Sequence, residues 1–237
     1  MKKVDFCRLC GKRKKLTFEH TPPAGAFNSS PVFFQDWENI FDKSSYLYGK
    51  RKRSNKGAGG LNLCKECNNN TGSWYANDYI KFSKIGAFVM THHVYATHFI
   101  TAEYCFKPLN ILKQILTMFV ALDSSKFLIK QPYLSEFLLE RESKKYPGNF
   151  KIFMYLTSSI CLRNPLSFSN MDGYFRTYGE ISYRPFGFHI SINSPPINRP
   201  YLEITHFKDF EYNQISNQIL PLRYLEPLGQ FPGLYAD

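Results

Sequence analysis

The sequence has no run of apolar residues long enough to cross a membrane. A membrane-spanning helix needs roughly 20 consecutive apolar residues, and no stretch approaches that length. The Met-Lys-Lys start leads into Val4-Asp5-Phe6-Cys7 and not into the apolar core of a signal peptide. We therefore expect a soluble, cytoplasmic protein with no membrane partner. In that compartment six cysteines indicate metal binding before disulfides.

Acidic side chains are scarce relative to basic ones. The 237 residues carry 30 Lys and Arg against 19 Asp and Glu, a formal net charge of +11. Most of the imbalance lies in residues 1–72, which hold 14 of the basic and 6 of the acidic residues. A basic surface of this kind favours a polyanion, most commonly nucleic acid, as partner. The alternative is a surface whose charge only keeps a small domain soluble.

Internal repeats and low-complexity tracts are also absent, so the chain is interpreted element by element. A short strand at 16–18 stops at Pro22-Pro23, and residues 24–58 show no sustained period and are predicted to form a long loop. Residues 59–63 are predicted to form the return strand. Apolar residues then recur at three- and four-residue steps, which predicts a helix from the second cysteine pair to about Met90.

The second part of the sequence changes from helical to strand-like character. Residues 108–120 predict a core helix that opens on a proline, and residues 132–142 predict a weaker one. Strand-like runs follow at 152–156, 181–183, 186–192 and 201–204. Cys105 and Cys161 lie in apolar stretches and are interpreted as buried. The chain is thus predicted to be α+β, with an N-terminal module at 1–90. The second region, at 91–237, is predicted to recognise a target or a partner and to end in a small antiparallel sheet.

Two C-x-x-C pairs provide four thiolates. Cys7 and Cys10 flank a tight turn in which Gly11 is free to take a positive φ, and Cys64 and Cys67 lie where the long helix begins. Four thiolates in this order are typical of a structural, tetrahedral Zn²⁺ site, whose binding energy is part of the folding energy. Two unrelated reduced C-x-x-C turns are the alternative.

Three polar residues lie beside these cysteines. Glu19 and His20 end the first strand, and Asn68 follows the last cysteine. Phosphodiester hydrolysis needs a base that deprotonates water and a hard cation that neutralises the phosphate. Imidazole suits the first task, while carboxylate and amide oxygens suit the second.

These residues resemble the four-cysteine branch of the HNH endonucleases, which have a ββα-metal fold on a treble-clef zinc scaffold. The resemblance covers about residues 5–80 and depends on the cysteine pairs, on Glu19-His20-Thr21-Pro22-Pro23 and on Asn68. It implies that His20 is the general base and that Glu19 and Asn68 hold a catalytic Mg²⁺ or Mn²⁺. The family's middle asparagine usually lies several residues before the third cysteine, where this chain has Gly59-Gly60; Asn62 is the nearest substitute.

The resemblance predicts an HNH endonuclease that acts on DNA in preference to RNA, in bacterial antiphage defence or mobile-element biology. Two basic runs are expected to contact phosphates on either side of the cut, with a solvated charge run as the alternative for each: Lys12, Arg13, Lys14 and Lys15, and Lys50, Arg51, Lys52 and Arg53. Two rival hypotheses remain. One is a non-catalytic zinc module that only binds nucleic acid, and the other is a nuclease subunit that needs a protein partner, such as an ATPase, bound through residues 91–237.

Overall fold

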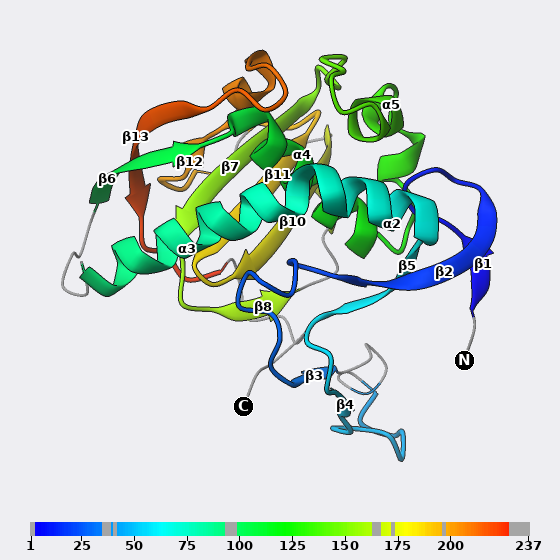
Figure 1. The fold of residues 1–237 in the computed structure, drawn as a ribbon. Helices are drawn as coiled ribbons and strands as arrows, with labels where there is room; N and C mark the ends of the chain where they lie inside the picture. Colours follow the sequence, from blue (N-terminus) through cyan, green and yellow to red (C-terminus); the bar gives the residue numbers. More distant parts are fainter. Residues whose placement is uncertain are drawn as a thin grey trace.

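The computed structural model describes residues 3–34, 39, 42–92, 99–162, 167–171, 174–195 and 198–227. They form a mixed α/β structure with few helices and several small antiparallel sheets, and this much of the predicted fold class is confirmed. A long helical rod crosses the front of the second region's sheet in Figure 1. Among the described residues, no helix is both long and apolar enough to cross a membrane.

The first sheet leads directly into the helical rod. Its antiparallel strands lie in the order β1 (Val4–Phe6), β2 (Arg13–His20) and β5 (Gly59–Cys64). β5 continues into α2 (Lys65–Thr71), a π-helical turn (Gly72–Ala76) and α3 (Asn77–His92). The predicted return strand and the helix from the second cysteine pair to about Met90 are both confirmed.

Residues 24–58 lie between the strands of this sheet, and their described part at 42–56 projects away from the rest of the molecule (Figure 1). They were predicted as loop, but they contain a short antiparallel pair of β3 (Val32–Phe34) and β4 (Lys52–Ser54). Strands of three residues are too short to produce a visible alternation in the sequence.

A central helix, α4 (Pro108–Leu122), is buried along almost its whole length. The sequence showed one apolar stripe, whereas the structure also buries the polar side chains of Asn110, Lys113 and Gln114. A helix buried on every face lies at the centre of a core. The weaker helix predicted at 132–142 is shorter, α5 (Leu134–Leu139), and a 3-10 turn (Leu128–Lys130) precedes it.

The largest sheet has six antiparallel strands in the order β12-β7-β11-β10-β8, with β9 also paired to β10. The strands are β7 (Phe150–Leu156), β8 (Ile160–Leu162), β9 (Ser167–Met171), β10 (Tyr174–Tyr183), β11 (Phe186–Ile192) and β12 (Leu202–Glu203). Helix α3 packs on it where Phe82 stacks on Phe186 at 4.6 Å between ring centroids. Gly86 is required beside this contact, because a Cβ there would lie 2.3 Å from the Phe186 ring.

Two strands far apart in sequence form a separate ribbon that was not predicted. β6 (Phe99–Phe106) pairs antiparallel with β13 (Ser216–Arg223), and a 3-10 turn (Thr205–Asp209) precedes β13. Alternate residues of β6 face outward, and Cys105 is exposed. The expectation that Cys105 is buried was therefore wrong, because residue type alone does not give strand phase. The side chain of Cys161 lies outside the described residues.

One hydrophobic cluster extends through both predicted regions. It contains Leu16, Phe82, Leu112, Phe186 and Leu222, together with three of the paired cysteines. The division at residues 90 and 91 stays a prediction.

Candidate metal centre and the neighbouring strand end

The first cysteine pair lies in a tight turn between β1 and β2. The Gly11 N–H donates to the carbonyl of Cys7 at 2.9 Å, and the Cys7 N–H donates to the carbonyl of Lys12 at 3.0 Å. Gly11 has φ +68°, the left-handed conformation expected from the sequence. The turn therefore directs the sulfurs of Cys7 and Cys10 to one side.

The second pair is presented by the junction of β5 and α2. Cys64 ends the strand and precedes the helix, and Cys67 lies in the first helical turn. The Cys64 N–H donates to the Cys7 sulfur at 3.3 Å. This contact brings the helix start against the first turn.

All four sulfurs lie within 4.8 Å of one another and could hold a metal ion such as zinc. The Cys10 and Cys64 sulfurs are 4.0 Å apart, close to the ~3.8 Å edge of a tetrahedron with Zn–S bonds of about 2.3 Å. A hydrogen bond from Cys67 lowers the pKa of Cys7 to about 4 and raises that of Cys67. Sulfurs this crowded cannot all ionise unless a cation is shared between them.

The first cysteine turn is also fastened to the second region. The Arg8 guanidinium donates to the carbonyl of Ala121 at 2.7 Å, near the end of α4. The Ser135 hydroxyl of α5 donates to the carbonyl of Leu9 at 3.0 Å. The cysteine cluster is therefore joined to the central helix.

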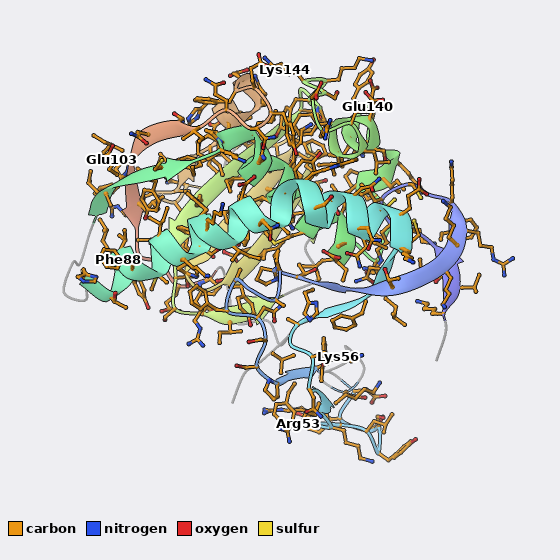
Figure 2. The ribbon with its side chains drawn as sticks, in the orientation of Figure 1. Arg53, Lys56, Phe88, Glu103, Glu140 and Lys144 are labelled. Carbon is orange, nitrogen blue, oxygen red and sulfur yellow. The ribbon has the colours of Figure 1, made fainter. Side chains whose placement is uncertain are left out.

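His20 ends β2 on the same face as Phe18. The two rings meet edge to face, with centroids 4.9 Å apart. The Lys56 ammonium, which is labelled in Figure 2, lies 5.8 Å from the centre of the Phe18 ring. A positive charge thus lies on the imidazole side of the strand, at a residue that the sequence did not single out as a contact.

Glu19 lies between Phe18 and His20 in β2, and its side chain is 9% exposed. Burial raises the pKa of its carboxyl group to about 8, because no counter-charge offsets the loss of water. No ion pair to Glu19 occurs within the described part of the chain. A carboxylate in such a position is suited to bind a cation.

Asn68 joins α2 to the same strand. Its amide nitrogen donates to the Thr17 hydroxyl and to the carbonyl of Phe18, both at 3.0 Å. These bonds occupy the nitrogen and leave the amide oxygen as an acceptor. The structure therefore brings Asn68 to the strand residues that immediately precede Glu19 and His20.

The three predicted site residues are not all in contact. Strand alternation puts Glu19 and His20 on opposite faces of β2, and in the described part of the chain no contact joins the His20 ring to Glu19 or Asn68. Their cross-strand partners are Gly60 for Glu19 and Gly59 for His20. Neither partner has a side chain, but a Cβ at Gly60 would lie 2.7 Å from the Asn62 amide nitrogen, so Asn62 covers the strand on the Glu19 face, where Glu19 is buried.

A buried asparagine that the sequence did not single out fixes the ends of the projecting segment. Asn28 donates to the carbonyls of Pro22 at 2.6 Å and Ala58 at 2.8 Å, and its oxygen accepts from the Ala58 N–H at 2.7 Å. Tyr183 of β10 donates to the same oxygen at 3.1 Å. Asn62, the nearest match to the family's middle asparagine, instead occupies the bulge in β5. An asparagine inside a loop gives no sequence signal for such a role.

The two basic runs lie on separate surfaces. Residues 12–15 begin β2, where Lys14 forms an ion pair with Glu66 at 2.7 Å. An open recess of about 620 Å³ beside the cysteine cluster is lined by Lys14, Lys15 and Lys65. Residues 50–53 are exposed on the projecting segment, and Figure 2 shows Arg53 there. The two runs can therefore contact a polyanion only at different points along its length.

Comparison with family models finds no match to this chain, and comparisons with curated proteins and with solved structures find none either.

Proposed function

We propose that the chain is a metal-dependent endonuclease of the HNH type that hydrolyses phosphodiester bonds in DNA. In this proposal β2, β5 and α2 form the ββα-metal module, and the four cysteines hold a structural zinc in a treble-clef arrangement. The observation that carries the proposal is the pair of hydrogen bonds that fastens Asn68 to Thr17 and Phe18. They bring an amide from the helix of the metal centre to the strand that ends in an acid and an imidazole.

The donor set at this strand end fits a hard divalent cation. Glu19 supplies a buried carboxylate without an ion pair among the described residues, and the oxygen of Asn68 supplies a neutral ligand. Mg²⁺ or Mn²⁺, when bound, would neutralise charge on the phosphate and on the leaving 3′ oxygen. Within the described residues, neither the Glu19 carboxyl nor the Asn68 oxygen has a protein partner to release, and Glu19 would give up only the proton that its raised pKa retains at pH 7.

His20 accepts the proton of the attacking water in this proposal. His20 is half-buried and its cross-strand partner Gly59 has no side chain, so a phosphate can approach the end of β2 on the imidazole face. The Lys56 ammonium lies on the imidazole face and attracts the same phosphate. A role in bacterial antiphage defence or mobile-element biology, and a need for a partner protein, are supported only by the family resemblance.

The test is cleavage of plasmid DNA by the purified protein with added Mg²⁺ or Mn²⁺. We expect His20→Ala to lower the rate at least ~100-fold, the usual contribution of a positioned general base. His92→Ala is the matched control, because His92 is an exposed histidine at the end of α3. It should cleave as the wild type does.

Zinc content and circular dichroism of both variants must equal those of the wild type for the comparison to hold. Equal cleavage by wild type and His20→Ala would mean a contaminating nuclease and would end the catalytic assignment. Oligonucleotide binding by a wild type that never cleaves would instead favour the non-catalytic zinc module.

A further inference from the structure

A second recess lies between the projecting segment and the six-stranded sheet. It encloses about 230 Å³. Phe27, Ser30 and Arg53 line it from the segment that begins after Pro23, and Ile160, Tyr183 and Arg184 line it from β8, β10 and the turn that follows. Both predicted regions of the chain therefore contribute to its wall.

The wall combines flat apolar surface with unpaired positive charge. Phe27 is an aromatic residue that stays 38% exposed, and it has φ +65°. Arg53 and Arg184 are both exposed, and neither forms a salt bridge within the described part of the chain. Two guanidinium groups at one small recess are suited to hold an anionic oxygen group such as a phosphate.

The recess is connected to the proposed active site through hydrogen bonds. Tyr183, which lines the recess, donates to Asn28, and Asn28 holds both Pro22 and Ala58. Pro22 lies two residues after His20, and Ala58 immediately precedes Gly59, the cross-strand partner of His20. A nucleic-acid strand held in the recess is therefore held in a fixed position relative to the end of β2.

We propose that this recess holds one unpaired nucleotide of the substrate strand next to the scissile phosphate. The base lies against Phe27 and Ile160, and the adjoining phosphate lies between Arg53 and Arg184. The volume is below the ~300–1,000 Å³ of sites for drug-sized ligands, so it suits one base at a time. The inference builds on the proposed nuclease function and deepens it.

The proposal has two consequences for the substrate and for the fold. A base inside a duplex is stacked and paired, so the recess favours a single-stranded, gapped or frayed substrate over a fully paired one. Arg184 belongs to the second region, so residues 91–237 supply part of the surface that binds the nucleic acid. The sequence predicted that this region recognises a target or a partner, but it singled out no residue there as a nucleic-acid contact.

Binding is measured by fluorescence anisotropy with a labelled single-stranded oligonucleotide, in the His20→Ala background and without added divalent ion. We expect Arg53→Ala and Arg184→Ala each to weaken binding about 5- to 10-fold and to reduce the slope of log affinity against log salt by about one. Arg141→Ala is the matched control, because Arg141 is exposed and pairs with Glu142 at 3.6 Å on another surface. It should leave affinity and slope unchanged.

A second measurement tests the base contact. An abasic site is moved along the oligonucleotide, and at one position it should weaken wild-type binding about 5-fold or more, the size of one lost stacking contact. Phe27→Leu should bind the intact oligonucleotide with an affinity lowered by the same factor. The abasic substitution should then lower the affinity of Phe27→Leu no further. Additive losses would show that the base and Phe27 do not meet.

The outcomes separate the recess from the nuclease. If Arg53→Ala and Arg184→Ala bind like Arg141→Ala, or if duplex binds more tightly than single strand, the recess proposal is overturned even when plasmid is cleaved. If the arginine and abasic effects appear but the wild type never cleaves, the recess stands and the nuclease proposal fails.

Discussion

His189 is a buried histidine with no hydrogen-bond partner for either ring nitrogen. It is 1% exposed and lies between the rings of Tyr178 and Tyr201, with Glu180 opposite it on β10. Burial, reinforced by the charge of Arg199, lowers its pKa to about 4. The imidazole is therefore neutral at pH 7 and pays for burial without forming a hydrogen bond.

His189→Phe should remove an acid sensitivity of the fold. The pKa is about 4 when folded and 6.5 when unfolded. Between these values the unfolded chain binds a proton that the folded chain does not. Stability is therefore full above pH 6.5 and falls as the pH falls toward 4, by up to ~3 kcal/mol. Urea unfolding at pH 7 and pH 4.5 should show a smaller acid loss in His189→Phe than in the wild type. An equal loss would assign the sensitivity to other groups.

The sequence predicts site residues whose chemistry is distinctive, and misses those whose role comes from position. Cysteine pairs at fixed spacing indicated the cluster that the structure brings together. Asn28 and Lys56 were missed, because their roles depend on contacts with Ala58 and Phe18 across the fold. How Glu19, His20 and Asn68 act together stays a prediction. The order of residues alone does not determine which way each side chain points where a strand ends.

At the scale of elements, β2 and β5 leave no room for a side chain at Gly59, where the proposed site lies. Gly59 has φ +157°, and a Cβ there would lie 2.0 Å from the carbonyl oxygen of Glu19. Any side chain at this position must push the strands apart. The spacing of the two strands at Glu19 and His20 therefore depends on a missing side chain.

Gly59→Ala should destabilise the fold by about 1–3 kcal/mol, the usual cost of overpacking, and should lower plasmid cleavage while zinc content stays unchanged. Urea unfolding measures the change in stability, and metal analysis measures the zinc content. Gly72→Ala is the control, because Gly72 is helical with φ −61° and a Cβ there would meet no atom within 4 Å. It should stabilise the fold by about 0.5–1 kcal/mol. Equal behaviour of the two variants would contradict the close approach.

Elements with a local signal were predicted, and those that depend on distant pairing were not. The rod from α2 to α3 follows from apolar residues at three- and four-residue steps. β6 has an alternating pattern, but its partner is β13, more than 100 residues later in the chain. No local pattern specifies such a pairing, and β3 and β4 are too short to have one.

At the scale of the whole molecule, the cysteine cluster stabilises the second region as well as the first sheet. Arg8 and Leu9, within the first cysteine turn, hydrogen-bond to the end of α4 and to α5. Helix α4 in turn lies in the core shared by both predicted regions. Loss of the metal should therefore disturb the central helix as well as the cysteine turn.

Cys64→Ser should lose bound zinc and unfold at a lower temperature. A loss of about 4 kcal/mol would lower the thermal midpoint by roughly 10 °C in a chain of this length. Cys105→Ser is the matched control, because Cys105 is an exposed cysteine outside the cluster. Metal analysis and thermal unfolding followed by circular dichroism measure both effects. Zinc content that is equal in the two variants would show that the four cysteines do not share an ion.

The pairing of β6 with β13 sets an order of events during synthesis on the ribosome. Residues 99–106 leave the exit tunnel long before residues 216–223 are made, yet among the described residues it is the later strand that covers the hydrogen-bonding edge of the earlier one. Until then Ile100 and Tyr104, which are buried in the finished molecule, lie on a strand that can recruit other nascent chains. Translation that stalls before residue 216 should therefore yield aggregation-prone polypeptide that depends on chaperones.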